Sequence, residues 1–174
     1  MIDNLQNILK SYLDNSSSFV FLGGVHGVGK TTACNTVFVE AGYCCVTASS
    51  LIKTFKSNTD KGKRVNDIAY NQAALLKQLA IERQKHDQLL LDGHFCLINS
   101  RDQIEPIAVD VFNAINPDLL ILLKGDPEVI AERLTRRDGK PWSLTFIQQF
   151  QEAEERHAQL ISRKLNTPLK VIAN

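Results

Sequence analysis

The sequence predicts an α/β protein in which helices cover both faces of a five-stranded parallel sheet. Three short runs are continuously apolar, as expected for strands that are buried on both faces. With two further strand-like segments, the predicted strands lie at 19–22, 43–47, 89–91, 119–123 and 169–173. Helical segments separate these strands, and this alternation is typical of a parallel sheet with right-handed crossovers.

The intervening helices follow from apolar spacing, composition and capping residues. They are predicted at 1–14, 30–41, 49–57, 66–85, 104–115, 127–137 and 143–165. Residues 66–85 are rich in Ala, Leu, Gln and Lys, which favour a helix. A capping acid, Asp126, precedes Pro127 at the first helical position, which marks a helix start. In such a sheet, ligands bind where the carboxyl ends of the strands meet.

Length and charge limit the classes of protein that fit this sequence. The 174 residues suit one domain at 19–174, preceded by an amphipathic helix and linker at 1–18. A net charge of +1, from 20 Lys and Arg against 19 Asp and Glu, argues against nucleic-acid binding. No apolar run reaches the roughly 18–20 residues that span a bilayer, and no signal-peptide pattern is present. With four cysteines outside any C-x-x-C pair, we expect a cytoplasmic protein without membrane association.

A glycine-rich motif follows the first predicted strand. Residues 24–31 are Gly-Val-His-Gly-Val-Gly-Lys-Thr, which matches the P-loop pattern G-x-x-x-x-G-K-[ST] between a strand and a helix. The glycines let successive backbone N–H groups curl around an anion, and the following helix adds its positive end. We therefore expect a triphosphate-binding site formed by Gly24, Gly27, Val28, Gly29, Lys30, Thr31 and Thr32.

The chemistry of a P-loop assigns roles to individual side chains. Lys30 would reach the β- and γ-phosphates, Thr31 would ligate Mg²⁺, and Thr32 could bond the α-phosphate, so ATP and Mg²⁺ are the expected cofactors. Mg²⁺ and its waters also need an acid at the end of an apolar strand. Asp92 ends one such strand, whereas the strand at 119–123 ends in a lysine. Asp92 is therefore the candidate metal-binding and catalytic acid, with a turn-capping role as the alternative.

Three arginines lie close together on one predicted helix. Arg133, Arg136 and Arg137 stand at i, i+3 and i+4, where like charges repel and a bound anion would relieve the repulsion. Phosphoryl transfer depends on cations that neutralise the transferred group. We expect this trio to bind the nucleotide or its acceptor, and residues 137–142 to form a short lid. The alternative is a solvated helix face with Glu132 as the partner.

A basic stretch follows the second predicted strand and favours an anionic acceptor at about 49–66. Its cations, opposed by one acid, are Lys53, Lys56, Lys61, Lys63 and Arg64. A phosphate acceptor needs no general base, whereas an alcohol would need a positioned carboxylate, for which Asp92 is the candidate. His94 follows two residues later and could contact the acceptor; a hydrogen-bonded structural histidine is the alternative.

Together these motifs resemble the P-loop nucleoside monophosphate kinases, the adenylate kinase-like group, and most nearly the archaeal-type adenylate kinases and related small bacterial ATP-binding proteins. Residues 47–53 resemble the family segment that brings a basic residue, here Lys53, to the acceptor phosphate, and residues 90–94 resemble its strand-end Asp-Gly motif. The resemblance implies a three-layer P-loop NTPase fold with strand order 2-3-1-4-5 and Mg-ATP as the donor. It also implies that Arg133 and Arg137 are catalytic lid arginines, with Arg133 contacting ATP. From its place in the same trio, Arg136 is the candidate acceptor contact.

The sequence departs from this family after the Asp-Gly motif. The family continues with Phe-Pro-Arg, whereas this chain has His-Phe-Cys at 94–96, so that acceptor arginine is absent. Two functions follow. The first is a kinase that transfers the ATP γ-phosphate to a small anionic acceptor, foremost a nucleoside monophosphate. The second is an ATP-hydrolysing or ATP-sensing switch that regulates a partner, with residues 1–18 available for docking or self-association. The near-neutral charge disfavours a polynucleotide-end kinase.

Overall fold

The structure is a computed structural model of the chain, and it describes residues 18–59, 68–99 and 101–173. The predicted N-terminal helix at 1–14 lies outside the described residues, as do Lys61, Lys63 and Arg64 of the basic stretch.

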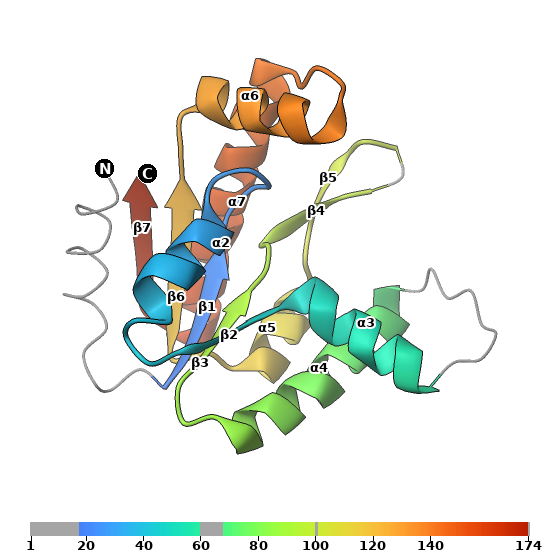
Figure 1. Ribbon diagram of the computed structural model, residues 1–174, viewed down its shortest axis with the longest axis vertical. Helices are drawn as coiled ribbons and strands as arrows, with labels where there is room; N and C mark the ends of the chain where they lie inside the picture. The colour runs from blue at the N-terminus through green and yellow to red at the C-terminus, as the bar shows by residue number, and fades with distance from the viewer. Residues whose placement is uncertain (1–17, 60–67, 100, 174) are drawn as a thin grey trace.

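The main sheet has five parallel strands, as the sequence predicts (Figure 1). They are β1 Phe19–Gly23, β2 Cys44–Thr47, β3 Leu89–Asp92, β6 Leu119–Lys124 and β7 Leu169–Ala173. Their order is β2-β3-β1-β6-β7, which is 2-3-1-4-5 when these five strands alone are counted along the chain. The register pairs Leu22 with both Asp92 and Ile121, so β1, β3 and β6 end at the same edge of the sheet.

Helices cover both faces of this sheet, which confirms the predicted fold class. They are α2 Lys30–Ala33, the π-helix η1 Cys34–Phe38, α3 Ala48–Thr59, α4 Ile68–Lys85, α5 Val109–Ile115, α6 Pro127–Asp138 and α7 Leu144–Leu165. Phe19 and Phe21 of β1 face a core cluster shared with α3, α4 and α5. Val20 and Leu22 face a second cluster shared with η1 and α6. Every residue of β1 is buried, because the strand has a core on each side.

Two segments differ from the prediction. The helix expected at 104–115 begins at Val109, because an antiparallel hairpin, β4 Cys96–Ile98 and β5 Ile104–Pro106, occupies the preceding residues. The Asn99 side chain fixes the hairpin turn by accepting the backbone N–H groups of Arg101 and Gln103. Figure 1 shows this hairpin extending from the sheet between α6 and α3.

The helix expected at 30–41 is α-helical for its first turn and then widens. The Val39 N–H donates to the Cys34 carbonyl oxygen five residues back, at 3.0 Å, which defines a π-helical turn. The Cys45 thiol of β2 lies 3.8 Å from the same oxygen. The Cys34 carbonyl therefore serves two donors directly after the P-loop helix. Such π-helical turns are found frequently at functional sites.

Candidate active site

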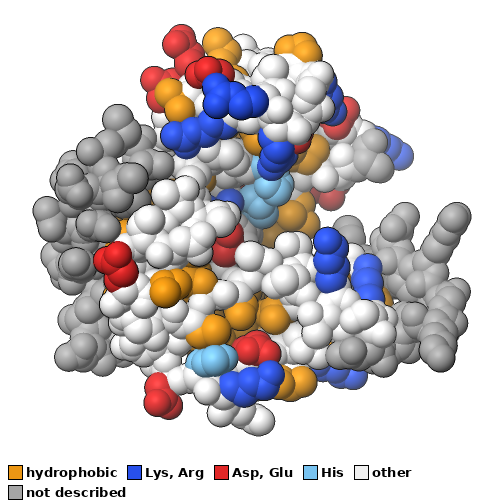
Figure 2. Space-filling view, viewed as in Figure 1, with side chains coloured by type: hydrophobic (Ala, Val, Ile, Leu, Met, Phe, Trp, Pro, Cys, Tyr) orange, Lys and Arg blue, Asp and Glu red, His pale blue; other side chains and the backbone are white. Residues whose placement is uncertain are grey.

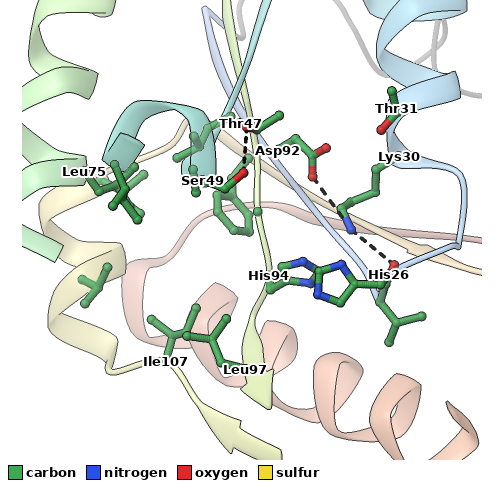
Figure 3. Close-up of a pocket in the computed structure, with 18 of the residues that line it drawn as sticks. His26, Lys30, Thr31, Thr47, Ser49, Leu75, Asp92, His94, Leu97 and Ile107 are labelled. Carbon is green, nitrogen blue, oxygen red and sulfur yellow. Dashed lines mark hydrogen bonds and ion pairs between the residues drawn. The ribbon is translucent and has the colours of Figure 1, made fainter. Parts of the chain in front are cut away.

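A cavity of about 1000 Å³ opens at the carboxyl ends of β1 and β3. Figure 2 shows the hollow in the middle of the molecule, with histidine side chains in pale blue and apolar side chains in orange on its walls. One end is lined by the predicted P-loop and by α6, and the other by α3, α4, α5 and the hairpin. The two ends differ in chemistry, which the close-up in Figure 3 makes visible.

The P-loop supplies the phosphate end of the cavity. Gly24, Gly27 and Gly29 have φ angles of 141°, 78° and 110°, which side chains rarely adopt. Residues of the loop that line the cavity include Gly27, Gly29, Lys30, Thr31 and Thr32. Val28 is buried in the core beneath the loop. The structure thus places five of the seven predicted phosphate-binding residues on one concave surface, whereas Gly24 and Val28 do not line it.

Lys30 and Asp92 lie opposite each other at this end (Figure 3). The Lys30 Nζ donates to the carbonyl oxygens of Gly24 and Val25, at 2.6 and 3.3 Å. It also lies 3.8 Å from Asp92 Oδ1. Burial lowers the pKa of Lys30, and the Asp92 carboxylate acts against this change; burial raises the pKa of Asp92, and Lys30 opposes it. The cation and the acid therefore sit in one partly desolvated pair at the rim of the sheet.

The donor set at this end fits Mg²⁺. Thr31 and Asp92 line the same part of the cavity and offer a hydroxyl and a carboxylate, which are the oxygen ligands that Mg²⁺ prefers. Among the residues that the structure describes, no cluster of three or more His, Cys, Asp or Glu side chains could hold a metal by itself. A site built from one or two protein oxygens is the kind that Mg²⁺ completes with water and substrate phosphates.

Two of the three predicted arginines reach the cavity. Arg133 and Arg137 line it, and the Arg133 Nη1 donates to the Gly27 carbonyl oxygen at 3.2 Å. Arg136 does not line it; its guanidinium is 79% exposed and bonds Glu132 at 3.1 Å. The alternative that the sequence left open, a solvated residue paired with Glu132, describes Arg136 alone.

The predicted lid segment, 137–142, is held by a small polar network. The Asp138 carboxylate accepts from the Arg137 guanidinium at 2.6 and 3.0 Å and from the Trp142 Nε1 at 3.0 Å. These bonds lower the pKa of Asp138. Gly139 ends α6 with a φ of 69°, and Ser143 caps α7 by accepting from the Phe146 N–H. Arg137 would exchange its Asp138 partner for phosphate oxygens if the segment closed over a nucleotide.

The other two predicted acceptor contacts, Lys53 and His94, differ in whether they line the cavity. Lys53 is exposed on α3 and does not line the cavity, although Thr47 and Ser49 nearby do. His94 lines the cavity, and its ring lies 4.2 Å from that of His26 in the P-loop, measured between centroids. Burial, followed by the electrostatic influence of the nearby His94 and Lys30 side chains, lowers the pKa of His26 to about 4.

Two polar residues of α7 that lie next to the site were not found by the sequence analysis. Glu154 is fully buried behind His94, and Gln151 bonds both the N–H and the carbonyl oxygen of Gly125, each at 2.9 Å. A signal existed for the first: Glu154 follows the core residue Phe150 by four positions and so places a charge on the apolar face of the helix.

The other end of the cavity is mostly apolar. Its lining residues are Leu75, Leu97, Ile107, Val111, Phe112 and Ile115. Asn71 and Gln72 of α4 add amide groups. Among the described residues that line the cavity, the Lys and Arg side chains are Lys30, Arg133 and Arg137, all at the phosphate end.

The four cysteines are all free in the structure. Cys34 and Cys96 are buried, and Cys44 and Cys45 pack into the clusters on opposite faces of the sheet. No helix in the described part of the chain has the length and apolar character needed to cross a membrane.

Comparisons with known proteins agree with this geometry. A relative from Thermoplasma acidophilum named adenylate kinase is 27% identical over 164 residues, which cover 87% of this chain and 86% of that protein. A Methanocaldococcus jannaschii protein, provisionally named an adenylate kinase, is 28% identical over 122 residues, which cover 70% of this chain. The chain spans 60% of the length of that second relative.

A solved structure and a protein family also match this chain. The crystal structure of TT1252 from Thermus thermophilus superposes with a TM-score of 0.53 at 13% identity, over 91% of this chain and 90% of that one, a likeness of fold alone. The sequence profile of the AAA domain family matches residues 23–145, which is more than two thirds of the chain. The protein therefore belongs to the AAA domain family, and its sequence is similar to the two archaeal proteins named as adenylate kinases.

Proposed function

We propose that the protein transfers the γ-phosphoryl group of Mg-ATP to a small anionic acceptor, foremost a nucleoside monophosphate. The observation that carries this proposal is the cavity of about 1000 Å³ that continues from the P-loop into a second, apolar end. Sites for one small molecule usually measure about 300–1,000 Å³, so this cavity lies at the upper end of that range, and its two ends differ in chemistry as sites for a donor and an acceptor would. A P-loop that only hydrolysed ATP would need no second compartment.

Each residue at the phosphate end has a role in this proposal. Lys30 would give up its carbonyl partners for the β- and γ-phosphate oxygens. Thr31 and Asp92 would hold Mg²⁺, which when bound neutralises phosphate charge. Arg133 and Arg137 would stabilise the charge that spreads over the transferred group, and their positions fixed on one helix make that stabilisation effective.

The apolar end favours a flat and weakly polar group such as a nucleobase. Leu75, Leu97 and Ile107 line it on the side opposite Lys30 (Figure 3). The amides of Asn71 and Gln72 could bond the polar edge of a base. A nucleotide bound this way would direct its phosphate toward the P-loop, and a phosphate oxygen attacks without a general base.

Two acceptor contacts stay predictions. Lys53 and Arg136 lie outside the cavity wall. They would meet an acceptor only if α3 or α6 moved on binding, as lids and acceptor segments of enzymes do.

One observation favours the alternative function, an ATP-hydrolysing or ATP-sensing switch. Among the described residues, the apolar end has no Lys or Arg to meet an acceptor phosphate. In this alternative the bound nucleotide would control a partner protein, and the apolar end would accept no small molecule.

A product assay separates the two functions. The full chain is incubated with Mg-ATP and each of a panel of nucleoside monophosphates, and nucleoside diphosphates are resolved by anion-exchange chromatography. We expect the diphosphate of one or more acceptors to form together with ADP. Release of inorganic phosphate at the same rate with and without every acceptor would refute the kinase proposal and support the switch.

The arginines allow a test of mechanism. We expect Arg133→Ala and Arg137→Ala to lower kcat by about 100-fold, the range for loss of one fixed charge-stabilising donor, and to change the Kd for ATP much less. Steady-state rates and calorimetric affinities measure the two effects.

The matched control for these variants is Arg156→Ala, which removes an exposed arginine from an i,i+4 pair with Glu152 on α7. It should leave both kcat and the Kd unchanged. If Arg133→Ala and Arg137→Ala raised only KM, the two side chains would bind the ground state and would not stabilise the transition state.

A further inference from the structure

A carboxylate lies fully buried on α7, directly behind the cavity wall that carries His94. Glu154 is 0% exposed. Its Oε1 accepts the N–H groups of Phe95 and Cys96, at 3.1 and 3.0 Å, and its Oε2 accepts the Phe95 N–H at 3.1 Å. The His94 ring lies against it, with Nδ1 3.6 Å from Oε1, a contact that is an ion pair only when His94 is protonated.

These contacts connect α7 to the phosphate end of the cavity. Phe95 and Cys96 belong to the segment that follows Asp92 at the end of β3, so Glu154 fixes the path of that segment. The His94 ring reaches the P-loop, where it lies 4.2 Å from the His26 ring between centroids (Figure 3). A continuous series of contacts therefore runs from Glu154 through His94 to the P-loop.

The charge of Glu154 also affects the pKa of Lys30 in the P-loop. Burial lowers the pKa of Lys30, and the negative charges of Asp92 and Glu154 both act against that change. Glu154 therefore helps to keep Lys30 cationic within a partly desolvated site.

The partners of Glu154 match a carboxylate. Burying a carboxylate is costly unless it is well bonded or paired with a cation. Gln151, one turn earlier on the same helix, meets one donor and one acceptor on Gly125, which suits an amide. Glu154 instead meets two N–H donors, which suits an acceptor-only carboxylate, and the same carboxylate lies beside the His94 ring.

We infer that Glu154 is a positioning residue for phosphoryl transfer: it fixes the segment after β3 and orients the His94 ring beside the P-loop. This inference rests on the proposed function for its kinetic consequence. The positioning itself is a property of the free protein and can be measured without turnover.

The kinetic test compares Glu154→Gln with Glu155→Gln. Glu155 is the next residue of α7, half-buried and paired with Lys124 at 2.5 Å, away from the cavity. With the acceptor that the unsubstituted protein uses, we expect Glu154→Gln to lower kcat about 10–100-fold, the range for loss of a group that orients a functional side chain. The Kd for ATP should change less than threefold, and Glu155→Gln should change neither. Equal kcat values for the two variants would overturn the inference.

A second kinetic measurement tests whether Glu154 acts through His94. If Glu154 acts through His94, the double variant with His94→Gln should be about as slow as the slower single variant, whereas multiplying losses would overturn the inference. Should Glu154→Gln fail to fold, Glu154→Asp keeps the charge and withdraws it by one methylene. We expect a kcat loss for this variant also, and full kcat would count against the inference.

A spectroscopic measurement tests the positioning directly. Long-range ¹H–¹⁵N spectra of ¹⁵N-histidine-labelled protein report the state of each imidazole nitrogen. Glu154→Gln should shift the His94 ring signals, and Glu155→Gln should leave them in place; unshifted His94 signals in both would refute the inference. Absence of transfer by the unsubstituted protein would refute the proposed function alone, and these spectra would still decide the role of Glu154.

Discussion

Replacing Lys30 with alanine is expected to lower the turnover of Mg-ATP by about a thousandfold or more while the fold stays intact. The Lys30 Nζ donates to the Gly24 carbonyl oxygen at 2.6 Å and lies 3.8 Å from Asp92, so it is fixed at the phosphate end of the cavity. Its loss would remove the cation that the γ-phosphate meets, and it would delete no apolar core side chain. Steady-state rates at saturating Mg-ATP, with circular dichroism of the same samples, measure the effect.

Two further variants make this result specific. Lys30→Met keeps the aliphatic stem and should be as inactive as alanine, because the charge is what matters. Lys85→Ala is the control: Lys85 is 56% exposed and pairs with Glu82 at 2.9 Å, away from the cavity. A folded Lys30→Ala protein that kept more than a tenth of the turnover would contradict the role given to this lysine.

Replacing Gly24 with alanine should destabilise the whole domain, by about 3 kcal/mol in the free energy of unfolding. A Cβ at this position would lie 2.7 Å from the backbone oxygen of Leu123, and the φ of 141° is one that side chains rarely adopt. The clash is with the neighbouring strand β6, which cannot move without disturbing the sheet. A fall of roughly 6–12 °C in Tm should accompany it.

The matched control is Gly139→Ala at the end of α6. Gly139 also has a positive φ, 69°, but a Cβ there would meet nothing within 4 Å. Only the left-handed backbone conformation is penalised, at about 1 kcal/mol. Urea denaturation of both variants separates steric conflict from backbone strain, and equal losses would contradict the close approach of Gly24 to β6.

The sheet was predictable because its strands are encoded locally. The side chains of a continuous apolar run such as 119–123 are removed from water only when both faces of the strand are covered. β6 is such a strand, with a core cluster on each face. The P-loop was predictable for a related reason, since its glycines and Lys30 are adjacent in sequence. The hairpin was not, because β4 and β5 have three residues each and depend on the turn that Asn99 organises.

The three arginines show how well helical spacing predicts which side chains reach a site. Residues four apart on a helix are about 40° apart around its axis, whereas residues three apart are about 60° apart on the other side. Arg137 therefore stays on the side of Arg133 that faces the P-loop. Arg136 turns toward Glu132, four residues before it, and pairs there. Helical spacing predicts that all three arginines share one face of α6. Of the three, Arg133 and Arg137 line the cavity and Arg136 does not.

The position of Glu154, four residues after Phe150, indicates a charge on the apolar face of α7 but does not show what Glu154 contacts. Its hydrogen-bond partners lie 58 and 59 residues away along the chain, so nothing local announces them. A buried carboxylate can be recognised only when the donors that surround it are known. The same holds for the apolar end of the cavity, where α4, α5 and the hairpin meet.

Isothermal titration calorimetry of the full chain with ATP and magnesium tests the central claim most directly. The account predicts saturable binding with one nucleotide at the P-loop per chain, weakened in Lys30→Ala and unchanged in Lys85→Ala. A folded, unsubstituted protein that takes up no ATP under these conditions would contradict the phosphate site, and with it both the kinase and the switch.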